Sequence, residues 1–279
     1  PRYYPRGNET MNDAVNREAA NVRKNVGICD VTTLGKIDIK GKDAAEFLNK
    51  IYSNPFAKVP VGRVRYGLML REDGICYDDG TTARLAEDHF VMTTTTANAV
   101  LVYRNMEFAR QCLFPDLDVH LISTTDQWAQ FAIAGPKSRD VLSKIIDKVD
   151  MSNDGFPFMA CSDVTVCGGT PGRLFRISFS GELAYEVAVP ARYGDALIRE
   201  IMAAGEEFDI TPYGTEALGV MRIEKGHVTG AELNGQMTAF NVNMNNMVSA
   251  KKDSIGSVLS RREVMVADNQ VRLVGVKTV

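Results

Sequence analysis

The sequence predicts an α+β fold in which two lobes of short antiparallel strands are each covered by helices. Three observations support this prediction. Short strand-like segments alternate with helical segments along the whole chain, and turn-forming residues separate them. No Gly-x-Gly-x-x-Gly follows a strand and no phosphate-loop signature occurs, so a dinucleotide-binding parallel sheet is not expected. The length of 279 residues suffices for one large core or two modest ones.

In the first half of the chain, local patterns place each expected element. Gly35 to Lys40 alternates as a strand, and Asp43 with Glu46 three residues later is typical of a capping box that starts a helix. Glu72-Asp73-Gly74 is a tight-turn signal. The other expected elements are a helix at 12–25, strands at 64–70, 81–85 and 90–95, and a helix at about 98–112.

The second half repeats this alternation. A strand at 128–134 closes at Gly135-Pro136, and Gly168-Gly169 before Pro171-Gly172 indicates a hairpin turn. Gly205 is a natural end for a helix. The other expected elements are strands at 164–167, 174–179 and 184–189, and helices at 138–146, about 193–204 and about 215–225.

Composition excludes several classes of function. The net charge of −3 and the pI near 5.7 give no reason to expect nucleic acid or an anionic membrane as a partner. No apolar run is long enough to span a membrane and no leader opens the chain, so we expect a cytoplasmic protein. The five cysteines and three histidines are scattered, so neither a metal site nor a serine-hydrolase triad is expected.

The two ends suggest a piece of a longer polypeptide. The chain begins at Pro1 without methionine, and Leu273 to Val276 is typical of a strand that has only just begun. A terminal apolar strand needs a partner sheet, so we expect a further domain to start near residue 271.

Asp78-Asp79-Gly80 allows two interpretations. A turn between two strands is favoured by the residues alone, because Asp and Gly are turn formers. The functional interpretation requires a carboxylate at a strand end, aimed into a pocket. Since neighbouring strand residues face opposite sides, only one of the two aspartates can be the working base. The charge of the other would raise the pKa of that base.

The segment Gly181 to Glu186 is a second candidate site. Glu182 and Glu186 alternate with apolar neighbours, so a solvated strand face is one interpretation. The other is a ligand site, because a carboxylate on a strand can accept two parallel N–H bonds from an amino-heterocycle such as pterin.

Arg222 lies at a helical position among Leu218, Met221 and Ile223. A buried arginine usually has a carboxylate partner, so we expect one for Arg222. Lys225, in the last turn of the same helix, is explained by helix-end stabilisation without any ligand.

Five segments together resemble the aminomethyltransferase superfamily, to which glycine-cleavage T-protein belongs. Their order and spacing agree over about 250 residues. The segments are VGICDVTTLGK at 26–36, RYGLML at 65–70, DGICYDDG at 73–80, AGP at 134–136 and FSGELAYE at 179–186.

Within that superfamily the chain is similar to the C-terminal part of the alpha subunits of heterotetrameric sarcosine oxidases. The segments TTLGK at 32–36, RVRYG at 63–67 and YGTEA at 213–217, and Asp79-Gly80, favour this branch. T-protein has Ser-His after Asp-Val and Gly-Ala-Arg-Asp at 214–217. Glu216 therefore stands where the family has an arginine that contacts folate.

The resemblance implies a three-domain cloverleaf with folate in its central hole. Residues 1–270 would form a folate-binding, aminomethyltransferase-like region of two interleaved lobes. Residues 271–279 would start a truncated C-terminal β-barrel domain.

The resemblance also implies roles for individual residues. Asp79 matches the catalytic aspartate of the family and Asp78 is its neighbour. Glu186 matches the glutamate that holds the pterin ring, and Tyr66 matches a pocket aromatic. The other candidate residues for cofactor binding are Thr95 and Thr96, which fall where the family lines the folate site, Phe179, which replaces a tyrosine, and Arg222.

The implied function is enzymatic transfer of a one-carbon unit, from the imine formed by sarcosine oxidation, to tetrahydrofolate. The product would be 5,10-methylenetetrahydrofolate. FAD, FMN and NAD are expected in the intact complex, although no motif in this chain binds them, and a flavin-bearing beta subunit is an expected partner. The alternatives are a stand-alone aminomethyltransferase or folate-dependent demethylase, and a non-catalytic folate-binding protein.

Overall fold

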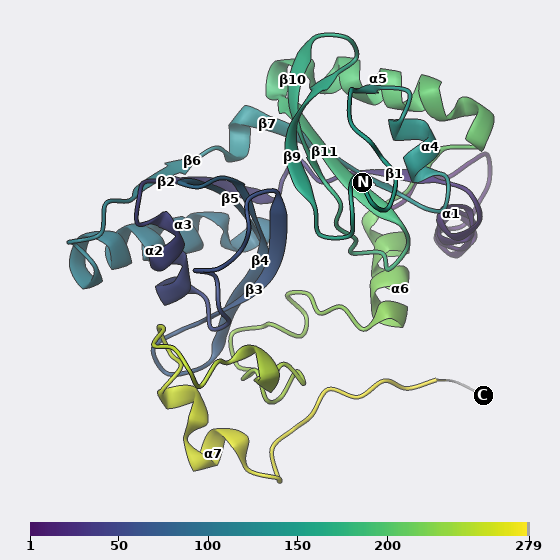
Figure 1. Ribbon diagram of the computed structural model, residues 1–279. Helices are drawn as coiled ribbons and strands as arrows, with labels where there is room; N and C mark the ends of the chain where they lie inside the picture. Colours follow the sequence, from purple (N-terminus) through teal and green to yellow (C-terminus); the bar gives the residue numbers. More distant parts are fainter. Residues whose placement is uncertain (278–279) are drawn as a thin grey trace. The chain divides into compact units, whose positions relative to one another are not determined.

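The computed structural model describes residues 1–277, which divide into two compact units. Each unit is built from two separate stretches of the chain. Unit 1 contains residues 1–33 and 125–227, and unit 2 contains residues 34–124 and those from 228 onward. Each unit combines an antiparallel-rich sheet with helices (Figure 1), which confirms the α+β class expected from the sequence.

Unit 1 contains a seven-stranded sheet in the order β12-β1-β7-β11-β10-β9-β8. β1 and β12 are parallel, and the other neighbouring pairs are antiparallel. The strands are β1 (Gly27–Asp30), β7 (Trp128–Ala134), β8 (Ile146–Asp147), β9 (Cys161–Val166), β10 (Thr170–Phe175), β11 (Ala184–Pro190) and β12 (Thr211–Pro212). The α-helices are α1 (Met11–Lys24), α4 (Ser138–Leu142), α5 (Gly194–Gly205) and α6 (Thr215–Lys225).

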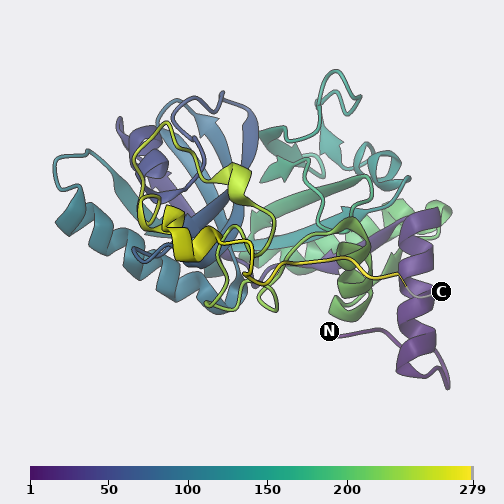
Figure 2. The same cartoon turned by 90° about the horizontal axis from the view of Figure 1, so that it is seen from below.

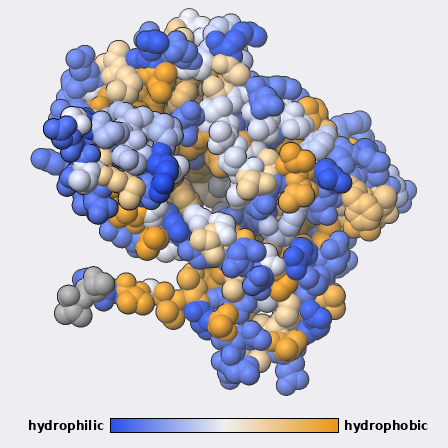
Figure 3. Space-filling model, turned by 180° about the vertical axis from the view of Figure 1, so that it is seen from behind, coloured by the Kyte–Doolittle hydropathy of each residue, from blue (hydrophilic) through white to orange (hydrophobic). Residues whose placement is uncertain are grey.

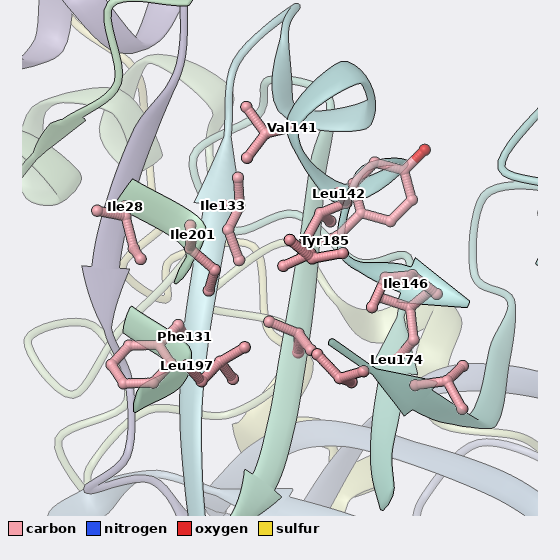
Figure 4. Packing of buried hydrophobic residues seen from close by; sticks show 14 of the residues in the cluster. Ile28, Phe131, Ile133, Val141, Leu142, Ile146, Leu174, Tyr185, Leu197 and Ile201 are labelled. Atoms are coloured by element: carbon pink, nitrogen blue, oxygen red, sulfur yellow. The ribbon is translucent and has the colours of Figure 1, made fainter. Parts of the chain in front are cut away.

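Strand alternation gives this sheet two different faces. Ile28, Ile133 and Tyr185 point to one face, where they pack with residues of α4 and α5 in the larger core (Figure 4). Cys29 and Ala184 point to the other face and pack with residues of α1 and α6. These two helices lie side by side in both ribbon views (Figures 1 and 2).

The N-terminal segment connects α1 to the start of α6 through hydrogen bonds and an ion pair. Glu18 of α1 is fully buried, and its carboxylate accepts N–H bonds from Tyr4 at 2.6 Å and Gly214 at 2.8 Å. The Glu216 N–H donates to the Arg2 carbonyl, and the Glu216 side chain pairs with the Arg2 guanidinium at 2.6 Å. Within unit 1, Glu216 therefore holds the N-terminal segment.

Unit 2 contains a five-stranded antiparallel sheet in the order β3-β4-β5-β2-β6. Its strands are β2 (Gly35–Lys40), β3 (Arg63–Leu70), β4 (Cys76–Ala86), β5 (His89–Thr94) and β6 (His120–Ser123). Its helices are α2 (Ala44–Ile51), α3 (Ala99–Phe108), which continues as a π-helical turn (Ala109–Leu113), and α7 (Glu263–Val266).

The two faces of this sheet are also covered differently. α2 and α3 pack on the face that carries Met69, whereas Leu68 and Leu70 point to the opposite face. That face is covered by residues 228–248, which contribute three methionines and three valines to the contact, namely Met237, Met244, Met247, Val228, Val242 and Val248. Residues 228–255 match the family too poorly for the sequence to assign them a role.

Several predicted elements are confirmed, and others need correction. The helix expected at 138–146 ends at Leu142, because Ile146 and Asp147 pair with β9 instead. The strand expected at 174–179 is shifted to Thr170–Phe175, where it pairs with both β9 and β11. Asp43 does not cap its helix; its carboxylate accepts the Asp118 N–H at 2.9 Å.

The strand expected at Leu273 to Val276 is absent. Residues 271–277 have no regular secondary structure, although the Leu273 N–H donates to the Asn241 carbonyl. A strand requires a ladder of bonds to a neighbour, and this single bond does not supply one. The apolar run precedes the grey terminal atoms in Figure 3. The last two residues of the expected barrel start, 278 and 279, lie outside the described residues.

Two glycines near α6 offer a test of the N-terminal fastening. A Cβ at Gly214 would lie 2.1 Å from the Arg2 carbonyl oxygen, whereas a Cβ at Gly219 would meet nothing within 4 Å. We expect Gly214→Ala to lower the free energy of unfolding by more than about 1 kcal/mol through steric strain. Gly219→Ala should raise it by about 0.5–1 kcal/mol through helix propensity. Urea unfolding of both variants checks this; equal effects would contradict it.

Candidate functional site

Asp78, Asp79 and Gly80 lie inside strand β4. Asp78 pairs with Met69, Asp79 with Leu68 and Gly80 with Gly67, so the strand continues through all three residues. The turn favoured by the residues alone is therefore wrong; the chain turns earlier, between Arg71 and Ile75. Turn-forming residue types were overruled by pairing with β3, since tertiary context outweighs local propensity in strands.

The two carboxylates point to opposite faces of the sheet, as the alternation of a strand requires. Asp79 shares a face with Leu68 and with residues 228–248, and Asp78 shares a face with Met69, α2 and α3. Only Asp79 can therefore act on the first side. The two aspartates thus face opposite sides of the sheet, as expected from the sequence; which of them is the working base stays a prediction.

Asp79 has the properties of a base for neutral pH. The Tyr66 hydroxyl donates to its Oδ2 at 2.7 Å. Burial, and to a lesser extent the negative charge of Asp78, raise the pKa of Asp79, while the Tyr66 bond lowers it; the result is a pKa of about 6. A carboxylate with this pKa is mostly ionised at pH 7 yet binds a proton far better than an exposed aspartate.

Tyr66 stays protonated beside Asp79. Burial and the Asp79 charge raise the pKa of the Tyr66 hydroxyl well above its usual range, so the hydroxyl remains a donor. The same hydroxyl lies 3.9 Å from the Met244 sulfur, in the segment that covers this face. Met244 thus joins the group around Asp79, although nothing in its sequence context indicated this.

Asp78 is 1 % exposed and is bound by the turn that leads into α3. The Thr95 backbone N–H donates to Oδ2 at 3.2 Å, and the Asn98 side-chain amide donates to Oδ1 at 3.0 Å. Burial raises the pKa of Asp78, and these two bonds oppose that shift. Thr95 therefore binds Asp78, while Thr96 is exposed at the next position.

Glu186 lies in the middle of β11 and is 9 % exposed. The Gln130 side-chain amide of β7 donates to its Oε2. Its neighbours across the sheet are Ala132 and Phe175, and Cys29 follows in the same row. A solvated strand face is therefore wrong for Glu186. Glu182, by contrast, lies in the loop before β11 and is half-buried.

Phe179 and Arg222 are both linked to His227. The Phe179 ring, 37 % exposed, stacks on the His227 ring with 5.6 Å between centroids. The His227 Nδ1 lies 2.9 Å from the Phe179 carbonyl oxygen, and Arg222 Nη1 donates to the His227 carbonyl at 3.1 Å. Arg222 is half-buried at the end of α6, so its described bond stabilises that helix end.

The predicted site residues thus form separate groups. Unit 2 brings together Asp79, Asp78, Tyr66 and Thr95, and unit 1 contains Glu186, Phe179 and Arg222. Sequence reasoning missed four further members, namely Asn98, Gln130, His227 and Met244. Asn98 could have been noticed, since Asn between a strand and a helix is a typical cap residue.

Other kinds of site are not indicated within residues 1–277. No group of three or more His, Cys, Asp or Glu side chains is placed to hold a metal ion, and no helix could cross a membrane. Two hollows of unit 1, of about 690 and 410 Å³, contain none of the predicted site residues.

Comparison with known proteins decides the family. The model of the GCVT N-terminal domain matches residues 1–252. The chain belongs to this family. The sarcosine oxidase subunit alpha of Rhizobium meliloti (strain 1021) is 56% identical over 277 residues, which cover 98% of this chain and 28% of that protein. An aminomethyltransferase of Anoxybacillus flavithermus is 31% identical over 86% of this chain and 64% of that protein.

These similarities confirm the resemblance read from the sequence. The chain spans less than a third of the sarcosine oxidase subunits that it matches. The glycine cleavage system aminomethyltransferase T of Bartonella henselae shares the fold, with a TM-score of 0.80 at 22% identity over 95% of this chain and 68% of that chain.

The raised pKa of Asp79 has a consequence for stability in this family member. Between pH 3.8 and about 6, the folded chain holds a proton on Asp79 that the unfolded chain releases, so protonation of Asp79 stabilises the folded chain. This stabilisation is complete below pH 3.8 and is lost as the pH rises through about 6. At pH 8 the buried charge costs on the order of 1–3 kcal/mol. We expect Asp79→Asn to raise Tm at pH 8 and to change it little at pH 4.5.

Thermal unfolding at the two pH values measures this. Asp88→Asn, in the exposed turn between β4 and β5, is the matched control and should leave Tm unchanged at both. A lower Tm of Asp79→Asn at pH 8 would show that the ionised Asp79 carboxylate does not destabilise the folded chain.

Proposed function

We propose that this chain is the one-carbon-transfer domain of a sarcosine oxidase alpha subunit. It would pass the one-carbon unit of the imine formed from sarcosine to tetrahydrofolate, giving 5,10-methylenetetrahydrofolate. The observation that carries the proposal is the buried Asp79, bound by Tyr66 and with its pKa raised to about 6. The 56% identity to a sarcosine oxidase alpha subunit supports the choice of donor.

Tetrahydrofolate supplies the nitrogen atoms that take up the carbon. Each nitrogen must lose a proton as its bond to carbon forms. Asp79 takes up each proton in turn, becoming a carboxylic acid while the N–H electron pair remains on nitrogen, and passes it on to the glycine nitrogen. The bond between the transferred carbon and the glycine nitrogen breaks, its electron pair stays on that nitrogen, and glycine leaves. General-base catalysis by a placed carboxylate contributes about 10²–10⁴-fold when its pKa lies near the working pH.

Tyr66 determines which oxygen of Asp79 accepts the proton. The Tyr66 hydroxyl occupies Oδ2, so Oδ1 is the oxygen left for the reacting nitrogen. The Tyr66 ring and residues 228–248 also limit water around Asp79, which keeps the pKa of Asp79 high. A poorly hydrated carboxylate accepts a proton more readily than one in water.

Glu186 would bind the pterin ring. Its carboxylate is buried at a central strand and oriented by Gln130, and an ionised carboxylate can accept two parallel N–H bonds from the aminopyrimidine part of pterin. Gln130 fixes the side chain in one orientation, so little rotamer freedom is lost when a ligand binds.

The donor imine would come from another part of the enzyme. Oxidation of sarcosine requires a flavin, and we place it on a separate, flavin-bearing subunit. The description of the R. meliloti relative as a subunit supports such a partner. A stand-alone aminomethyltransferase is the second candidate, supported by the 31% identity to the A. flavithermus enzyme. Both candidates use the same acceptor chemistry at Asp79.

Removal of the base tests the reaction. We expect Asp79→Asn to lower the rate of methylene transfer at least about 100-fold, because Asn cannot take the proton, while tetrahydrofolate affinity stays within about threefold. The measurement is 5,10-methylenetetrahydrofolate formation by the assembled oxidase, with Asp88→Asn as the control. A normal transfer rate in Asp79→Asn would exclude this role.

Glu186→Gln tests the binding site separately. Charge-assisted hydrogen bonds contribute about 1.5–3 kcal/mol, so the Kd for tetrahydrofolate should rise about 10–150-fold. Isothermal calorimetry measures the Kd, and Glu182→Gln, four residues earlier and outside the strand, should bind normally. Unchanged affinity in Glu186→Gln would remove Glu186 from the pterin site.

A further inference from the structure

Asn98 occupies the N-cap position of α3 but does not cap this helix. Its backbone angles are φ −100° and ψ −2°, and its side chain makes no bond to the first-turn N–H groups. Asparagine is among the best N-cap residues, and a cap bond typically contributes about 1 kcal/mol to stability. A side chain that forgoes this bond is held elsewhere by another interaction.

The Asn98 amide instead points at β4. Its Nδ2 donates to Asp78 Oδ1 at 3.0 Å and lies 3.4 Å from the Tyr77 carbonyl oxygen. The Thr95 N–H binds the second carboxylate oxygen of Asp78, and the Asn98 N–H donates to the Thr95 carbonyl. The turn from Thr95 to Asn98 is therefore folded around a single buried carboxylate.

Such an arrangement favours the ionised form of Asp78. Burial raises the pKa of Asp78, and the hydrogen bonds from Asn98, from Thr95 and from the Asp79 backbone lower it. A buried carboxylate that lost a donor would take up a proton instead of keeping a charge in an apolar setting. Asn98 thus helps decide whether Asp78 is an anion.

The charge of Asp78 matters because Asp79 follows it directly in the strand. The groups that act on the Asp79 charge are Tyr66 from β3, Asp78 from β4 and the burial of the site. The Asp79 charge also raises the pKa of Tyr52, at the end of α2, and of Cys76, in β4. Both side chains stay neutral, and the pKa of Cys76 is raised to about 12. Among the described residues, Asp78 is therefore the charged group that raises the pKa of Asp79.

We propose that Asn98 is a positioning residue for the transfer reaction: together with the Thr95 N–H it fixes the Asp78 carboxylate on the far face of β4, directly before Asp79 in the strand. The inference rests on the proposed function of Asp79. The turn from Thr95 to Asn98 would then influence the reaction through Asp78, without contacting the ligand. This role of Asn98 also explains why the cap position of α3 is left without its usual bond.

Asn98→Leu tests this, because leucine has a similar size and offers no donor. We expect Asp78 to become protonated and the pKa of Asp79 to fall by about one unit. Carbon-13 NMR of carboxyl-labelled aspartate in the full chain follows this titration directly, with Asp79→Asn identifying the signal. In the assembled oxidase, the acid limb of the transfer rate should move to lower pH by the same amount, and the plateau rate should fall several-fold.

Asp78→Asn should give the same shift, and the double variant Asp78→Asn/Asn98→Leu should shift no further than either single variant. Asn105→Ala, in the same helix, is the control and should titrate like the wild type. Asn98→Leu removes a donor from the buried Asp78 carboxylate, so its thermal stability should fall somewhat. The shift of the Asp79 titration is the readout that a purely structural role of Asn98 would not produce.

The outcomes separate the two claims. An unmoved Asp79 titration in Asn98→Leu would overturn the positioning role, whatever the transfer rate. If Asp79→Asn lost transfer activity while the Asp79 titration in Asn98→Leu stayed unchanged, the proposed function would be supported and the role of Asn98 would be refuted. Normal transfer in Asp79→Asn would refute the proposed function, and with it the catalytic meaning of Asn98.

Discussion

Strand β4 places two ionisable carboxylates next to each other in the backbone, and the pleat of the strand sends them to opposite faces of the sheet. Neither can leave its environment without breaking the pairing with β3. Asp79 is consequently kept largely buried beside Tyr66, and Asp78 is kept among the donors that precede α3. The pKa of Asp79, and with it the proposed chemistry, depends on this single constraint.

The surrounding structure serves the two faces differently. On the Asp78 face, α2 and α3 form an apolar core, so the buried Asp78 carboxylate must be satisfied by neutral donors. On the Asp79 face, residues 228–248 cover Leu68 and Leu70 with flexible side chains, including Met244 beside Tyr66. Methionine adapts to irregular surfaces, which suits a cover that must leave room beside a reactive group.

Unit 1 shows the same use of buried carboxylates, for two purposes. Glu18 is fully satisfied by backbone N–H groups and fastens the N-terminal segment to α6. Glu186, within a strand row of Cys29, Ala132 and Phe175, is oriented by a side-chain amide from β7.

Much of the fold could be predicted from the sequence, because helices such as α5 and strands such as β2 and β7 carry their own periodicity and end signals. The family resemblance likewise rests on short motifs, so Asp79 and Glu186 could be named in advance. The sequence could not place β1, β6 or residues 228–248. These segments are short or irregular and become ordered only through their neighbours.

Tertiary structure alone decided the rest. Pairing with β3 turned Asp78 to Gly80 from an apparent turn into strand, and pairing with β9 ended α4 early. The partner of Asp43 proved to be a distant backbone N–H, and Asn98 gave its amide to Asp78 rather than to its own helix. Polar side chains choose partners by distance in space, and a linear sequence does not contain those distances.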